Sequence, residues 1–441
     1  MHVDGTGQVR PGKAGVFEGV TPYHWLVVII ASAGWLFDCM DQRLFVLARE
    51  PALRDLLASQ AEEAGAVARF GGYATTSMIL GWATGGIIFG MLSDKIGRVK
   101  TMVLTLLVYS GFTGLCGIAH SWVDFTAYRF LAGIGIGGMF GAATTLVAES
   151  VPGQFRVLAL GALQALSATG NILGSLISLW IPPGSPDVFG FAGWRVLFFI
   201  GVLPALLVVP IVFILKEPAA WLAARAEAAS GAARNVGSLG ELFREPRWRR
   251  NTLVGLFLGL AGMVGLWGIG FFSPELISTA LQGEPQSVVD RVRGWGTAFQ
   301  DVGAFVGMMT FTMVAAFLSR RAAFFGALLL SMLATMYVFG SLQSATDAYW
   351  MLPMMGFAQM SVFAGYSIYF PELFPTRLRG TGVGFCYNTV RYLAAPAPIL
   401  LGYLATMFSF RTAAVLMCSV YLVGMIALIW APETKGKPLP E

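Results

Sequence analysis

Three ionisable side chains, Asp38, Asp41 and Arg43, lie inside or at the edge of a long apolar run that starts near His24. An ionised carboxylate in hydrocarbon costs several kcal/mol, so such a group must be paired, protonated or turned toward a water-filled cavity. Asp38 and Asp41 are three residues apart and share one helical face. Arg43 points elsewhere and is better placed to extend to the membrane surface. The two carboxyls are therefore candidates for proton chemistry facing a wet cavity.

A partner for these carboxyls is predicted from depth. If the first apolar helix ends near residue 46 and the fourth begins near 122, Asp38 and Arg129 lie roughly 12 and 10 Å below the same surface. We therefore predict that Arg129 neutralises the Asp38/Asp41 pair. Two acids around one guanidinium leave one surplus carboxyl, which burial and like charge favour in its protonated form, so one of them could exchange a proton near neutral pH. A static structural bridge is the alternative.

Arg391 is a second intramembrane cation, near the middle of a later apolar run. A guanidinium stays charged and binds carboxylates through two N–H groups, which makes Arg391 the best candidate for an anionic group of a substrate. A bridge to Asp301 is the alternative. Other polar and aromatic side chains could line the same cavity, although each alone is more often a packing residue. They are Gln164, Asn171, Trp267, Gln300, Gln359, Tyr366, Tyr387, Asn388 and Tyr392.

The composition indicates a membrane protein that crosses the bilayer many times. Of the 441 residues, 56% are hydrophobic and only 12% are charged, against about 25% charged in soluble domains. No signal peptide is expected, because the first 22 residues are polar. Runs of about 20 apolar residues predict twelve spans near 24–46, 70–93, 101–119, 122–147, 156–181, 194–215, 251–281, 295–318, 322–341, 347–370, 380–407 and 410–430.

The basic residues indicate the orientation. With both termini in the cytoplasm, 19 of the 29 Lys and Arg residues fall in cytoplasmic segments, 7 in outer segments and 3 within spans. This bias predicts cytoplasmic termini in the cell (inner) membrane. The expected domains are an N-terminal segment, a six-helix bundle, a central cytoplasmic loop, a second six-helix bundle and a cytoplasmic tail, at 1–23, 24–215, 216–250, 251–430 and 431–441.

A short signal repeats in the two halves. Glu149 and Arg156 in "AESVPGQFRVLALG" correspond to Glu372 and Arg379 in "PELFPTRLRGTGVG", each displaced by 223 residues, about half the chain. A parallel six-helix repeat is a recurring transporter architecture, with the substrate bound near the midplane between the halves.

At these motifs the chain resembles the major facilitator superfamily over essentially its whole length. "GMLSDKIGRVKT" is similar to the superfamily pattern G-x-x-x-D-R/K-x-G-R/K-R/K, with Val99 as a departure, and "RFLAGIGIGGMFG" is similar to its R-x-x-x-G-x-G pattern. "DCMD" partly matches the D-G-x-D pattern of aromatic-acid–proton symporters, with Cys39 in place of glycine. "RYLAAPAP" resembles a later motif of the same carriers.

The resemblance implies an all-α membrane protein with twelve transmembrane helices in two six-helix bundles, working by alternating access. It also implies a gate on the cytoplasmic rim, where Asp94, Lys95, Gly97 and Arg98 would clamp one conformation. Two matching bridges, Glu149/Arg156 and Glu372/Arg379, would break and re-form as the halves rock. We interpret the Gly-rich stretch 133–141 as tight helix packing, because it follows no strand and lies in a span.

These observations favour a proton-coupled carrier for a small organic anion. A sugar, polyol or organic-cation carrier is the alternative, since "GWR" and "KEPAAWL" look like loose sugar-porter signatures. A transport-like receptor has less support, because we expect no long cytoplasmic signalling tail after the last span. A membrane enzyme has less support, because the sequence offers no nucleophile–base set or metal-ligand spacing. We expect no enzyme activity, cofactor or metal. The expected partners are a small-molecule substrate, protons and the lipid bilayer, not nucleic acid, and the expected carrier is a monomer.

Overall fold

The computed structural model describes residues 2–3, 9–10, 15–57, 66–230 and 236–441. Lys13 and Arg234, two residues of the predicted cytoplasmic segments, therefore lie outside the described residues, as do the middle of the first outer loop and part of the N-terminal segment. Apart from a short antiparallel strand pair, β1 (His2–Val3) with β2 (Val9–Arg10), the described elements are helices.

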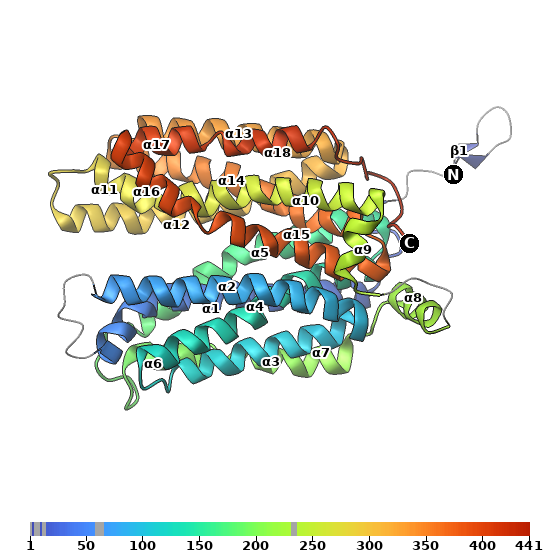
Figure 1. Cartoon of the computed structure of the whole chain (residues 1–441), viewed down its shortest axis with the longest axis horizontal. Helices are drawn as coiled ribbons and strands as arrows, with labels where there is room; N and C mark the ends of the chain where they lie inside the picture. Colours follow the sequence, from blue (N-terminus) through green and yellow to red (C-terminus); the bar gives the residue numbers. More distant parts are fainter. Residues whose placement is uncertain (1, 4–8, 11–14, 58–65, 231–235) are drawn as a thin grey trace.

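The first half of the chain forms six spans, which lie together in Figure 1. Five are single helices and the sixth is made of three shorter pieces. They are α1 (Pro22–Leu57), α2 (Ala66–Ile96), α3 (Arg98–Cys116), α4 (Trp122–Ser150), α5 (Gly153–Trp180), and α6 (Gly193–Ile200) followed by η2 (Leu203–Leu207) and α7 (Val208–Ile214).

The second half repeats this plan after two short helices, α8 (Ala219–Ala229) and α9 (Leu239–Arg244). Its spans are α10 (Pro246–Met263) with η3 (Val264–Ile269), η4 (Gly270–Phe272) and α11 (Ser273–Ala280); α12 (Gln286–Phe317); α13 (Arg320–Ser341); α14 (Ala345–Leu373); η5 (Thr376–Leu378) leading to α15 (Arg379–Ala394) and α16 (Ala397–Met407); and α17 (Phe410–Met417) with α18 (Val420–Ala427). Eleven helical stretches of the described residues are long and apolar enough to cross a membrane, and α14, with 29 residues, is the twelfth span. The predicted fold class is confirmed.

The internal repeat is visible in helix capping. At the start of α4, the Ser121 hydroxyl accepts from the backbone of Asp124, whose carboxylate accepts from the backbone of Ser121. Ser344 and Asp347 form the same reciprocal box at the start of α14. Both residues lie 223 positions after their counterparts, so the two halves start this helix with the same hydrogen bonds.

Helix α1 differs from the expectation, because it continues to Leu57 instead of ending near residue 46. Its buried face continues through Ala48, Ala52 and Leu53, which pack into a cluster with Phe125 of α4. This apolar packing keeps the chain helical beyond residue 46, where the apolar run of the sequence ends. Asp38 therefore lies farther from the end of its helix than the sequence predicts.

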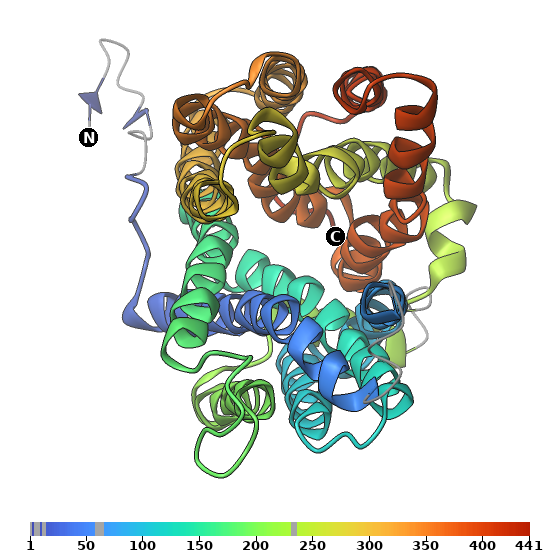
Figure 2. The same cartoon turned by 90° about the vertical axis from the view of Figure 1, so that its left-hand side faces the viewer.

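The two halves lie side by side along their whole length (Figures 1 and 2). Helix α2 packs against α15, and α5 packs against α12 and α14. We call the end where α1 begins and α18 ends the terminal end. Close to it, a Cβ on Gly90 of α2 would lie 2.7 Å from the carbonyl oxygen of Gly380 in α15. Glycine at this position therefore lets the two backbones touch.

Candidate functional site

The Arg129 side chain contacts one of the two predicted carboxyls. Its Nη1 lies 3.4 Å from Oδ2 of Asp41, its Nη2 donates to the Thr113 hydroxyl at 2.7 Å, and its Nε lies 3.2 Å from Sγ of Cys116. Asp41 and Arg129 are fully buried. Arg129 therefore lies close to the predicted carboxyls, as expected from depth, and the carboxyl that it contacts is that of Asp41.

Aromatic rings enclose this pair within the first bundle. The Arg129 guanidinium lies 5.3 Å from the ring centre of Phe45 and 5.0 Å from that of Phe198. Gly201, where α6 ends, brings its backbone against Asp41, since a Cβ there would lie 3.1 Å from Oδ1. The expectation that Asp41 faces a wet cavity is wrong, because α1, α3, α4 and α6 surround it.

Asp38 has a different environment one helical turn away. It is fully buried, and neither carboxylate oxygen has a hydrogen-bond partner among the described residues. The same bundle also contains buried donors that have no partner among the described residues. They include Nε1 of Trp35 and the hydroxyls of Tyr109 and Ser110. A buried polar group without a hydrogen bond is costly. Asp38 is thus the carboxyl that Arg129 does not neutralise.

Arg391 lies between the halves, 5% exposed. Its guanidinium carbon is 3.9 Å from the ring centre of Trp82 in α2 and 4.7 Å from that of Tyr387. Nη1 donates to the Tyr387 carbonyl and to Oδ1 of Asn388, both at 2.8 Å. No ion pair joins Arg391 to a carboxylate within the described ranges. Trp82 and Arg391 lie roughly 21 and 18 Å along their helices from the terminal end, which is near mid-membrane.

Asp301 is bound by a different arginine from the one considered. Nη2 of Arg43 in α1 lies 2.8 Å from Oδ2 of Asp301 in α12, and the two side chains are 27% and 26% exposed. The alternative bridge between Arg391 and Asp301 is therefore wrong. So is the interpretation of Arg43 as a membrane-surface anchor, because its long side chain instead crosses to the second bundle.

Two of the other predicted lining residues lie at the contact between the halves. The Tyr387 ring stacks on Phe140 of α4, with ring centres 3.8 Å apart. The Tyr392 hydroxyl lies 2.5 Å from that of Thr84, but Tyr392 is 37% exposed and so belongs to the outer seam between α2 and α15.

The remaining predicted lining residues have varied surroundings. Two polar side chains of α14 serve packing within the second bundle: Gln359 donates to Thr335 at 3.0 Å, and Tyr366 donates to the Leu258 carbonyl at 2.7 Å. Gln300 accepts from Ser273 at 2.9 Å. Gln164 is buried, with no partner for Oε1 among the described residues, whereas Asn171 and Trp267 are half-buried. Trp267 lies in the π-helical turn η3.

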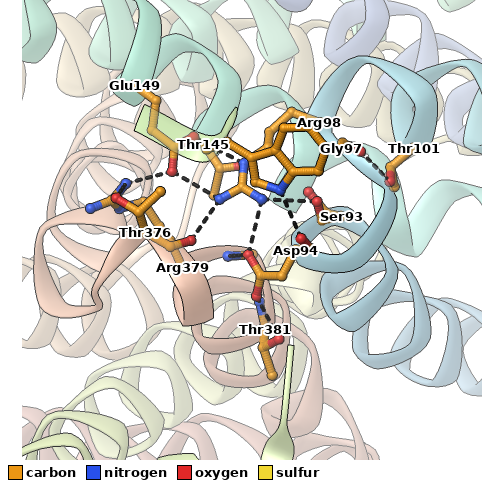
Figure 3. A network of polar contacts seen from close by, with 12 residues as sticks. Ser93, Asp94, Gly97, Arg98, Thr101, Thr145, Glu149, Thr376, Arg379 and Thr381 are labelled. Carbon is orange, nitrogen blue, oxygen red and sulfur yellow. Dashed lines mark hydrogen bonds and ion pairs between the residues drawn. The ribbon is translucent and has the colours of Figure 1, made fainter. Parts of the chain in front are cut away.

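At the terminal end, a buried charge network joins the halves (Figure 3). Arg98 binds both oxygens of Glu149 at 2.9 Å, lies 3.1 Å from Asp94, and donates to the Thr376 carbonyl of the other half at 2.8 Å. Arg379 of the second half also binds Glu149. Because all four charged side chains are fully or almost fully buried, each depends on the others for its counter-charge.

Asp94 adds a second link across the same contact. Its carboxylate accepts from the backbone N–H of Gly380 at 2.9 Å, and from the N–H and hydroxyl of Thr381 at 2.8 and 2.6 Å. These donors open α15, so a carboxylate from the first half caps a helix of the second half. The Trp221 indole of α8 donates to the Asp94 carbonyl at 2.7 Å.

Gly97 has a structural reason to be glycine. Its φ of 115° and ψ of 159° lie in a region that is essentially reserved for glycine. The turn exposes the first N–H groups of α3 to Glu217, whose carboxylate accepts from Arg98 at 2.7 Å, Val99 at 3.1 Å and Lys100 at 3.2 Å.

The predicted bridges within each repeat are wrong. Arg156 donates to the Ala148 carbonyl at 2.8 Å instead of pairing with Glu149. Glu372 pairs with Arg320 of α13 at 2.9 Å instead of with Arg379. Lys95 is exposed and has no ion pair within the described residues.

The sequence reasoning passed over several residues of these networks. Glu217 lies in "KEPAAWL", more than 100 residues from the start of α3 that it caps, so the local sequence carries no signal for this contact. Trp82 and Thr381 carry no signal of their own, because their partners come from distant segments. Among the described residues, no group of three or more His, Cys, Asp or Glu side chains could hold a metal ion.

Comparisons with known proteins place the chain in a family. The model of the Major Facilitator Superfamily matches residues 33–397. The cis,cis-muconate transport protein of Acinetobacter baylyi is 31% identical over 368 residues, which cover 82% of this chain and 84% of the relative. A probable 4-methylmuconolactone transporter of Cupriavidus pinatubonensis is 27% identical, covering 92% of this chain and 89% of the relative.

Among solved structures, the proton:xylose symporter XylE superposes with a TM-score of 0.76 at 20% identity, covering 95% of this chain and 98% of that one. At this identity the likeness shows the fold alone. The family match agrees with the twelve-span architecture. The chain belongs to the major facilitator superfamily and is a membrane transporter, not an enzyme.

Proposed function

We propose that this transporter carries a small organic anion, with at least one carboxylate, by proton symport. The observation that carries the proposal is Arg391: a guanidinium buried between the halves, with no carboxylate partner among the described residues. A buried cation is stable only with a counter-charge, and a bound substrate carboxylate would supply it. The Trp82 and Tyr387 rings beside it suit a flat, conjugated acid.

The relatives support the same substrate class. Proteins named for cis,cis-muconate and for 4-methylmuconolactone transport are 31% and 27% identical to this chain over the aligned residues. Muconate is an unsaturated dicarboxylate, so its charge and flat shape match a site built from a guanidinium and aromatic rings.

Asp38 is the proposed proton carrier. It has no counter-charge among the described residues, because Arg129 contacts Asp41. In its neutral form Asp38 could remain buried, whereas its ionised form needs water or a cation. Gain and loss of one proton at Asp38 would therefore favour different conformations of the first bundle.

The conformational cycle would break two sets of contacts in turn. The terminal-end network of Asp94, Arg98, Glu149 and Arg379 holds the halves together at one end. The Arg43–Asp301 pair holds them farther along. We propose that the terminal end is cytoplasmic, from the bias of basic residues, and that the protein lies in the inner membrane as a monomer.

The test is transport by the full chain in lipid vesicles. Uptake of labelled cis,cis-muconate, benzoate and xylose would be measured with an internal pH dye. We expect uptake of an acid together with acidification, and no uptake of xylose. An Asp38→Asn variant should still bind the acid but should no longer acidify the vesicles. Transport of xylose alone would overturn the anion proposal, and unchanged acidification by Asp38→Asn would overturn the role of Asp38.

A further inference from the structure

A groove of about 460 Å³ runs between α10 and α18 at the terminal end, on the outer surface of the second bundle. Its walls include Leu253 and Phe257 of α10 and Ile426 of α18, which are 42%, 45% and 54% exposed. Exposed apolar side chains on spanning helices face lipid chains. The groove therefore opens to the membrane and is separate from the site around Arg391.

Two arginines close the groove at its polar end. Arg249 and Arg250 lie in the first turns of α10 and are exposed. Neither guanidinium has a hydrogen bond or ion pair with a carboxylate in the part of the chain that the structure describes. The indole of Trp430, 58% exposed, lines the same end, and tryptophan is typical of the membrane–water boundary.

The order of these residues along α10 matches the order of groups in a phospholipid. Arg250, Leu253 and Phe257 follow one another at helical spacing of three and four residues, so they share one face. From Arg250 to Phe257 the face runs roughly 10 Å into the hydrocarbon. A guanidinium pair at the boundary suits a phosphate, and the apolar wall below suits the upper part of an acyl chain.

We propose that this groove is a binding site for one anionic phospholipid, with its phosphate between Arg249 and Arg250 and an acyl chain against Leu253 and Phe257. Under the orientation proposed above, the lipid comes from the cytoplasmic leaflet. The charge favours an anionic lipid over a zwitterionic one, because the residues that line the groove include two arginines and no carboxylate.

The test uses the full chain, purified and exchanged into nanodiscs of phosphatidylcholine with small amounts of phosphatidylglycerol. Native mass spectrometry would count the lipids that remain bound after release. We expect one phosphatidylglycerol to be retained in preference to phosphatidylcholine. Each removed arginine should weaken retention about fivefold, the effect typical of one basic residue near anionic lipid, so the Arg249→Gln/Arg250→Gln variant should lose most of it.

Two further variants separate a built site from a general positive surface. Arg247→Gln removes a charge from the same turn, but Arg247 stacks on Trp248 at 4.7 Å and does not line the groove, so retention should not change. Leu253→Trp fills the apolar wall without changing the charge and should reduce retention. Equal loss in Arg247→Gln, no loss in the double variant, or displacement of the lipid by soluble glycerol phosphate would overturn the proposal.

Discussion

Asp38 and Asp41 lie on one face of one helix, yet their surroundings separate them. Arg129 contacts Asp41 and leaves Asp38 without a partner among the described residues. We predict that Asp41→Asn strongly destabilises the fold, by about 3–5 kcal/mol, because it leaves a buried guanidinium without its carboxylate. Asp38→Asn removes no ion pair within the described residues and should have little effect on stability. Thermal unfolding in detergent would compare them, and equal Tm values would contradict the assignment.

Arg391 should be sensitive to a substitution that keeps its charge. Lysine cannot reproduce both the stack on Trp82 and the two-pronged hydrogen bonding of a guanidinium. We expect Arg391→Lys to raise the KM for an acid substrate by roughly tenfold to hundredfold, the effect of losing one or two contacts of that kind. Tyr392→Phe, at the exposed seam, is the control and should keep its KM. Initial rates of uptake into vesicles would measure both, and a normal KM for Arg391→Lys would count against a carboxylate contact.

At the level of single residues, the sequence predicted which charged groups lie in one region better than it predicted their partners. The spacing of Asp38 and Asp41 and the depth of Arg129 brought three charges to one region. The same reasoning could not tell which carboxyl faces Arg129, since residues three apart share a face. The prediction for Arg43 is wrong because its partner, Asp301, comes from the other half of the chain.

Helix α3 offers a matched pair of glycines. Gly97 precedes its first turn with φ of 115° and lies against the Glu217 carboxylate. A Gly97→Ala variant should lose about 1–3 kcal/mol, because alanine is strained there. Gly111 lies in the middle of the same helix with open space around its Cα, so Gly111→Ala should gain about 0.5–1 kcal/mol. Thermal unfolding of the two variants should give Tm shifts of opposite sign, and shifts of the same sign would show that backbone conformation is not the cause.

The helices themselves were largely predictable, because hydrophobic length and the 223-residue repeat are local or periodic signals. The pairings at the terminal end were not. Glu149 and Arg379 occupy the repeated positions that the sequence indicated, but they bind each other across the halves. Glu372 binds Arg320 from a neighbouring helix of its own half. The repeat fixes where each charge lies in its bundle, and only the docking of the bundles decides which charges meet.

The molecule as a whole is held closed at two levels. The Arg43–Asp301 pair lies roughly 24 Å from the level of the buried network at the terminal end. This is the distance along α12 from Asp301 to the end of the helix at Phe317. Alternating access requires that one set opens while the other stays closed. The network is buried and shares its charges, whereas the Arg43–Asp301 pair is partly exposed. The second set is therefore the easier one to open.

This difference predicts how the halves respond when the weaker contact is removed. Spin labels at Tyr73 and Trp350, exposed near the starts of α2 and α14, would report the end opposite the terminal end. Labels at Lys95 and Lys435, both exposed, would report the terminal end. In Arg43→Gln or Asp301→Asn we expect the open population at the opposite end to rise up to about fivefold, because a partly exposed ion pair contributes at most about 1 kcal/mol.

The terminal end should remain closed in both single variants, since its own network is intact. The charge-exchanged double variant, Arg43→Asp with Asp301→Arg, restores an ion pair between α1 and α12 and should return the distances at the opposite end toward those of the original protein. Electron–electron double resonance would measure both label pairs. If the exchanged variant stays as open as the single variants, side-chain size or helix packing, not the charge pair, holds the halves together at this level.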